Sequence, residues 1–246
     1  MLLRTACFLS LALAAVPATA AEQLKKIPAA LDPAKAYVLV EVHNHDEGIA
    51  RGVVVFARYD PEGGDLRGGK RSPPSGLGKD VPVRIASTKP LLKEKERRLY
   101  LLTLEPDTWV IEGAGGTAFS LGSKTFKAVA GQVIDLGIFS PGGDWPDGEG
   151  PFKLTAGKLV GMALLGPFAK GPKPQPAMLA IRERTADDMP VPEPLRARVV
   201  SAVFTSGAKF GNYLGGLVNR IDGRKGRPGS QPVEAAAPAA GAGESR

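Results

Sequence analysis

The shortness of the apolar runs is the feature that most constrains how this 246-residue chain can fold. Runs rich in Val, Ile, Leu and Tyr are separated by turn-forming residues, of which the chain has 31 Gly and 22 Pro. Such runs are typical of strands, whereas βαβ units would place long helical periods between them. The sequence therefore predicts a mainly β fold, an antiparallel β-sandwich. The expected strands are residues 36–43, 52–59, 81–87, 98–104, 109–113, 124–129, 132–139, 158–165 and 177–182.

Two segments rich in Gly and Pro interrupt this pattern. Residues 60–80 contain two leucines as their only large apolar residues, which predicts a long mobile loop. Residues 167–176 (PFAKGPKPQP) predict an extended, polyproline-like connector. Short apolar runs separated by turn-forming residues occur on both sides of these segments, so we expect a single β-rich domain over residues 21–222.

The apolar spacing changes from the strand period to the helical period near the C-terminus, which predicts one amphipathic helix over residues 208–221. Gly215 and Gly216 weaken this prediction, each by about 1 kcal/mol relative to Ala. We expect the helix to pack across the sheet. The alternative is a role at a membrane surface or on a partner. The residues with helical spacing are Phe210, Tyr213, Leu214, Leu217, Val218 and Ile221.

The two ends of the chain predict export and a free tail. Arg4, the apolar run 6–16 and the small residues before Ala21 match a secretory signal peptide over residues 1–20. A membrane anchor is the alternative, but the run is shorter than the roughly 20 residues that span a bilayer. Residues 223–246 contain almost no large apolar residue, which predicts a disordered tail.

Cysteine usage and charge exclude several classes of function. Cys7 is the only cysteine and falls inside the leader, so the exported chain has no thiol nucleophile, disulfide or cysteine metal site. The net charge of +7 is compatible with peripheral contact with anionic membranes or envelope polymers. Nucleic acid is not an expected partner, because an exported chain without a basic stripe interleaved with aromatics lacks the features that bind it.

Residues 104–139 have a recognisable arrangement of turns and strands. A Pro-Asp turn leads into the strand WVIEG, and FKAVAG precedes the strand QVIDLGIF, which has a glycine in its middle. In that last strand Ile134, Leu136 and Ile138 alternate with the other residues, which predicts one fully apolar face.

This arrangement resembles a pattern of small exported β-sandwich domains of the Gram-negative envelope, including those of the DUF2846 type. The resemblance covers residues 104–140, with Asp107 in place of a turn glycine and Asp135 in place of an apolar or aromatic residue. It implies a non-enzymatic envelope module and carries no catalytic residues over.

Both histidines of the chain lie in residues 41–48 (EVHNHDEG). If the first strand continues through this segment, Glu41, His43 and His45 lie on one face, with the two histidines about 7 Å apart along the backbone. Two histidines and a carboxylate can hold zinc and leave a position open for water. Against this, no further histidine exists to complete a catalytic site, and the segment from Asn44 to Gly48 is rich in turn formers, so the competing interpretation is a solvent-exposed hairpin end.

Other catalytic motifs are missing from the sequence. No G-x-S-x-G elbow accompanies the histidines, and neither a phosphate-binding loop nor a dinucleotide fingerprint occurs. The sequence thus predicts an exported, periplasmic or outer-membrane-associated protein that acts as a non-enzymatic binding or structural module without a cofactor. The alternative is a metal-dependent hydrolase that uses Glu41, His43 and His45.

Overall fold

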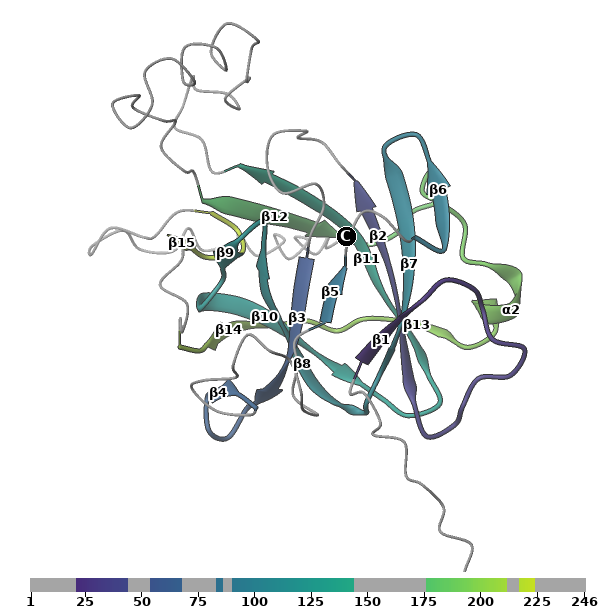
Figure 1. The fold of residues 1–246 in the computed structure, drawn as a ribbon, viewed down its shortest axis with the longest axis horizontal. Coiled ribbons are helices and arrows are strands. Elements are labelled where there is room, and N and C mark those ends of the chain that lie inside the picture. The colour runs from purple at the N-terminus through teal and green to yellow at the C-terminus, as the bar shows by residue number, and fades with distance from the viewer. Residues whose placement is uncertain are drawn as a thin grey trace, which may run out of the picture.

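The computed structural model describes residues 21–43, 54–67, 83–85, 90–143, 176–211 and 217–223 (Figure 1). Across these residues the chain is mainly β, as the sequence predicts, and its strands form two sheets. Eight of the nine expected strands are present, two of them with the expected bounds, and the ninth, residues 158–165, lies outside the described residues.

Within the described ranges the first sheet has seven strands, and its central path runs in the order β1, β7, β2, β11 and β12. Strand β6 extends it beside β7, and β13 pairs with β11. The bounds are β1 Ala21–Leu24, β2 Ala36–His43, β6 Leu92–Glu94, β7 Arg97–Leu104, β11 Val133–Gly143, β12 Ala177–Arg182 and β13 Val199–Ser201.

The second sheet has eight strands in the part of the chain that the structure describes, and its central path runs in the order β14, β10, β8, β3 and β4. Strand β5 pairs with β3, while β9 pairs with both β8 and β15. The bounds are β3 Val54–Asp60, β4 Asp65–Leu66, β5 Val83–Ile85, β8 Asp107–Ala114, β9 Thr117–Ala118, β10 Leu121–Ala128, β14 Thr205–Lys209 and β15 Leu217–Val218. A four-residue helix, α2 (Glu193–Arg196), precedes β13.

Pairing direction departs from the purely antiparallel expectation. Strand β11 lies parallel to β2 on one side and parallel to β13 on the other. Parallel neighbours require a long crossover connection, and here about ninety residues separate β2 from β11. Residue patterns report which face of a strand is buried but not which way its neighbour runs, so the sequence could not show this.

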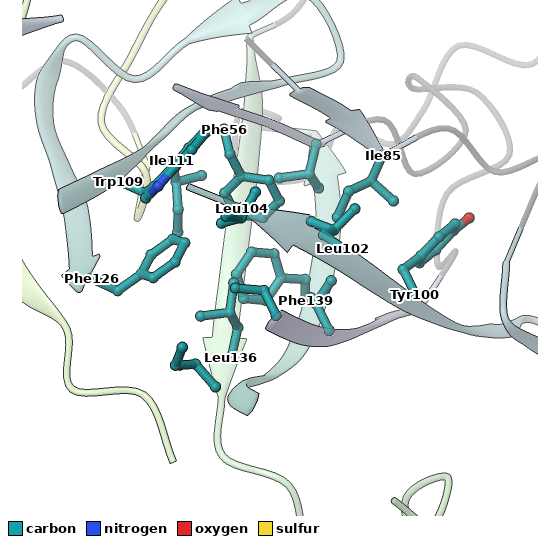
Figure 2. Packing of buried hydrophobic residues seen from close by; sticks show 14 of the residues in the cluster. Phe56, Ile85, Tyr100, Leu102, Leu104, Trp109, Ile111, Phe126, Leu136 and Phe139 are labelled. Carbon is teal, nitrogen blue, oxygen red and sulfur yellow. The ribbon is translucent and has the colours of Figure 1, made fainter. Parts of the chain in front are cut away.

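The two sheets share one hydrophobic core (Figure 2). Phe56 of the second sheet contacts Phe126 of the same sheet edge-to-face at a ring distance of 5.9 Å, and Phe139 of the first sheet at 6.0 Å. Such offset aromatic pairs add to the stabilisation that comes from buried area alone. Each sheet therefore contributes large side chains to a single packed interior.

A second cluster covers the opposite, outer face of the first sheet. Tyr37 and Leu39 of β2 pack there with Met189 and Leu195, which come from the segment between β12 and β13. Strand β2 is thus buried on both faces, which explains why residues 36–42 form a nearly continuous apolar run.

The predicted C-terminal helix over residues 208–221 is wrong for the part of it that the structure describes. Residues 205–209 form β14, and residues 217–218 form β15. Ala208 and Phe210 are buried while Lys209 and Gly211 are exposed, which is the two-residue period of a strand. The glycines in this segment disfavour a helix, and a strand edge at β10 was open to accept pairing, so tertiary context decided the outcome.

Several other predictions fall wholly or partly outside the described residues. These are the signal peptide over residues 1–20, most of the loop 60–80, most of the connector 167–176 and all but the first residue of the tail 223–246. The described start of the loop is ordered as a tight hairpin, in which β4 pairs with the end of β3. Among the described residues no helix is long and apolar enough to cross a membrane.

A bulge in the middle of β11 changes the predicted alternation of that strand. The register with β2 shifts between Asp135 and Ile138, and Gly137 adopts a positive φ of 80°. Ile134 and Leu136 face the shared core as expected, but after the bulge it is Phe139 that joins them there. A bulge inserts one extra residue and so reverses which side chains face inward.

We predict that Gly137→Ala lowers the free energy of unfolding by about 2–5 kcal/mol, because a Cβ there would lie 2.2 Å from the carbonyl oxygen of Arg182 on a strained backbone. Gly142→Ala in the same strand is the matched control, since its Cβ would meet nothing within 4 Å. Urea denaturation of both variants measures the difference. Equal effects of the two substitutions would contradict this explanation of the bulge.

Candidate functional site

A fully buried carboxylate, Glu41, lies near the end of β2 on the outer face of the first sheet. Its Oε2 accepts hydrogen bonds from Arg184 Nη1 at 2.6 Å and from the backbone N–H of Met189 at 3.1 Å. Its Oε1 lies 2.7 Å from Nε2 of His43. A buried charge is costly unless it is paired and hydrogen-bonded, and both oxygens of Glu41 meet that condition.

Arg184 joins this carboxylate to a second one, Asp135 of the neighbouring strand β11. The Arg184 Nε and Nη2 atoms donate to the two Asp135 oxygens at 2.7 and 3.1 Å, in a two-point contact. Burial acts to lower the pKa of Arg184, but the hydrogen bonds to Asp135 and Glu41 outweigh it and raise this pKa. Arg184 therefore remains charged between two carboxylates of adjacent strands.

Asp135 also stabilises the bulge of its own strand, because its Oδ1 accepts a hydrogen bond from the backbone N–H of Gly137 at 2.9 Å. Asp135 thus has a structural role within its own strand as well as in the ion pair. We name Glu41, Asp135 and Arg184 together the Arg184 clamp.

A third carboxylate, Asp188, closes the turn that follows the clamp arginine. Both of its oxygens accept hydrogen bonds of 2.6 Å from Arg182, and Oδ2 also accepts from the backbone N–H and hydroxyl of Thr185 at 2.8 and 2.9 Å. The hydrogen bonds from Arg182 are the main cause that holds the pKa of Asp188 well below its usual range. The Asp188 side chain is 3% exposed, so solvent screens its interaction with Arg182 only weakly.

Two of the three predicted metal ligands come together in the structure. Glu41 and His43 lie within hydrogen-bonding distance, whereas His45 lies outside the described residues. Asp188 joins them, since ligand atoms of Glu41, His43 and Asp188 all lie within 4.8 Å of one another. Sequence analysis missed Asp188 because it lies far along the chain in an ordinary turn sequence, with no spacing that relates it to β2.

The charges around these three residues do not favour a cation. Arg184 donates to Glu41, and Arg182 forms the two-point contact with Asp188, so each carboxylate already has a positive partner. A divalent ion placed here would have to compete with two guanidinium groups that lie within contact distance of its ligands. The chemistry of the group is therefore closer to a buried ion-pair network than to an open metal centre.

A cavity of about 380 Å³ lies beside the clamp, on the other edge of β11. Strand β13 pairs with β11 only as far as Asp135, and β12 begins pairing only at Ile138, so the bulge leaves a gap between the two partners. The described residues that line the cavity come from this gap and from the segments that follow β12 and β13. They are Lys124, Asp135, Leu136, Gly137, Ile181, Arg182, Glu183, Arg184, Thr185, Ser201, Ala202 and Phe204.

Besides Arg182, which is paired with Asp188, the cavity wall carries two charged residues outside the clamp, Lys124 and Glu183. Among the described residues, no ion pair is formed by the Lys124 ammonium group or by the Glu183 carboxylate. Ile181 and Phe204 provide an apolar surface, and Phe204 is fixed by an edge-to-face contact with Phe126 at 6.2 Å. Sequence analysis did not find this site, because the gap depends on which strands pair with β11.

Comparisons with known proteins place this chain in no family. No protein-family model matches it, and searches of curated proteins and of solved structures gave no match. The geometry of the site is therefore the basis for the proposed function.

The low pKa of Asp188 predicts how stability depends on pH. The folded-state pKa lies below the unfolded value of about 4, so the carboxylate stabilises the fold above that pH, and this contribution is lost as the pH falls through the folded-state pKa. Asp188→Asn should lower the free energy of unfolding by about 1–3 kcal/mol at pH 7, and the difference from wild type should shrink as the pH approaches 2.

Urea unfolding between pH 2 and pH 7 measures this difference. The neighbouring Asp187→Asn is the control, because its side chain is exposed. A gap between wild type and Asp188→Asn that stays constant over the whole pH range would contradict the assignment.

Proposed function

We propose that this protein is an exported, non-enzymatic binding module of the bacterial envelope, with a β-sandwich fold, that takes a small zwitterionic ligand in the cavity beside the Arg184 clamp. The observation that carries the proposal is that Lys124 and Glu183, which form no ion pair among the described residues, both line one cavity that also has an apolar wall. A short peptide has a matching arrangement, because its carboxylate can meet the ammonium group, its amino group can meet the carboxylate, and its side chain can meet Phe204.

Export and envelope location rest on sequence features. The signal peptide over residues 1–20 and the absence of cysteine after Cys7 support it, and so does the resemblance of residues 104–140 to exported DUF2846-type domains. The basic net charge supports peripheral contact with anionic envelope surfaces.

The non-enzymatic part of the proposal rests on how the candidate catalytic groups are engaged. Glu41 and Asp188 are each bound to an arginine, and His43 is hydrogen-bonded to Glu41. A hydrolase would need a base or a metal-bound water facing an open cavity, and none of these three residues lines the described cavity.

The alternative function is a metal-dependent hydrolase, favoured by the approach of Glu41, His43 and Asp188 to within 4.8 Å. It requires the metal to displace Arg182 or Arg184 from their carboxylates. Stoichiometric zinc in the purified protein, lost in His43→Ala with a fall in melting temperature, would support it. Metal-free protein and unchanged melting in His43→Ala and His45→Ala together would exclude it.

The binding proposal predicts that the dipeptide Ala-Ala binds in the cavity and that a capped analogue without charges does not. Lys124→Gln and Glu183→Gln should each weaken binding about tenfold, equivalent to about 1.4 kcal/mol, because each removes one charge-assisted contact. NMR chemical-shift titration of the amides around Gly137 measures the affinity.

Ser201→Tyr should abolish binding by filling the cavity, since Ser201 lines it. Val200→Tyr is the matched control on the same strand, because Val200 is exposed and does not line the cavity. The proposal fails if Ala-Ala causes no shifts near Gly137, or if both tyrosine variants bind alike.

A further inference from the structure

Strand β7 carries two polar side chains on the face that otherwise contributes to the shared core. Tyr100, Leu102 and Leu104 of this strand belong to the core, and Arg98 extends the same face by one strand period. Arg98 lies opposite Val42 of β2, and Tyr100 lies opposite Val40. An arginine and a tyrosine hydroxyl are therefore directed between the two sheets, next to apolar side chains.

Three polar atoms of these two residues are buried and have no partner in the part of the chain that the structure describes. Nε and Nη1 of Arg98 and the hydroxyl of Tyr100 have negligible exposure and form no hydrogen bond with any described residue. Tyr100 as a whole is fully buried. Nearly all buried donors in folded proteins are paired, so three unpaired ones on a single face indicate that a ligand group supplies the acceptors.

The three donor atoms favour an anionic ligand, because an anion can accept hydrogen bonds from all of them. The guanidinium group of an arginine can only donate hydrogen bonds, and it is a cation. Burial raises the pKa of Tyr100 to about 12 although the nearby charge of Arg98 acts to lower it, so the phenol keeps its proton and can donate as well. A carboxylate or phosphate has enough lone pairs to accept from all three atoms.

The side chains around Arg98 and Tyr100 are apolar, which favours a ligand whose remaining part is apolar too. In Figure 2 the Tyr100 hydroxyl points away from the packed core side chains, at the side of the cluster where Ile85 lies. Val40 and Val42 are fully or almost fully buried beside the pair, and no acidic residue of β2 or β6 lies directly opposite Arg98 or Tyr100. The acid group of a ligand that reaches these donors would therefore lie beside apolar side chains, with no carboxylate of these two strands to compete for the donors.

We propose that Arg98 and Tyr100 form a second ligand site, which binds the acid group of an anionic amphiphile such as a medium-chain carboxylate. Neither residue lines the cavity beside the Arg184 clamp, so the site is separate from that of the proposed function. The exposed cations Lys93 and Lys95 of the adjacent β6–β7 hairpin attract such an anion toward this end of the sheet.

Isothermal titration of the full chain with decanoate tests the proposal. We expect one molecule of decanoate to bind, Arg98→Gln to weaken binding at least tenfold, and Tyr100→Phe to weaken it severalfold. Arg97→Gln is the matched control, because Arg97 precedes Arg98 on the opposite face and bonds to Glu94 and to the carbonyl of Asp187. It should bind decanoate within twofold of wild type, and none of the three variants should change Ala-Ala binding.

Two further titrations separate the parts of the ligand. Decanol binding as tightly as decanoate would overturn the role of the acid group, and inorganic phosphate displacing decanoate at equal concentration would overturn the role of the apolar body. Tyr100→Phe removes a single oxygen and preserves the packing, so its decanoate affinity tests the proposal even if Arg98→Gln fails to fold. Unchanged decanoate affinity in a folded Tyr100→Phe or Arg98→Gln variant would show that the pair is structural.

Discussion

The ion pair of Arg184 with Glu41 and Asp135 is the interaction on which the rest of the structure depends. The two carboxylates lie on β2 and β11, the adjacent parallel strands at the middle of the first sheet, and both are buried. Without the arginine, two negative charges would lie in a low-dielectric environment with too few donors. The arginine comes from the segment after β12, so the pair also holds that segment over the outer face, where Met189 and Leu195 complete the second hydrophobic cluster.

The same constraint shapes the cavity. Asp135 binds Arg184 through its carboxylate and fixes the bulge at Gly137, while Gly137 allows the carbonyl of Arg182 to approach closely. The bulge interrupts pairing along the edge of β11, where β13 ends and β12 begins. The ion pairs that neutralise these buried charges therefore also form the cavity on which the proposed function rests. They also engage Glu41, which a metal centre would need as a ligand.

Much of the fold could be predicted from the sequence, because strand patterns are local. The strand over residues 36–43 has the bounds that the sequence predicts, because its run of Val, Leu and Tyr lies between turn-forming segments. The features that could not be predicted depend on distant partners. They are the parallel pairing of β11 and the strand conformation of Ala208 and Lys209, which begin the predicted helix 208–221 but pair with β10. At the site, the Glu41–His43 pair followed from strand geometry, but Asp188 and Arg184 could not be predicted, because only the folded chain brings them to β2.

The central claim is that Arg184 and Glu41 stabilise the fold as a coupled pair, and a double-mutant cycle tests it most directly. Arg184→Met should lower the free energy of unfolding by about 3–5 kcal/mol, whereas Arg196→Met, at an exposed ion pair with Glu193, should lower it by less than about 0.5 kcal/mol. Glu41→Gln combined with Arg184→Met should cost less than the sum of the single substitutions by about 1–3 kcal/mol. Additive effects within about 0.5 kcal/mol would contradict the account.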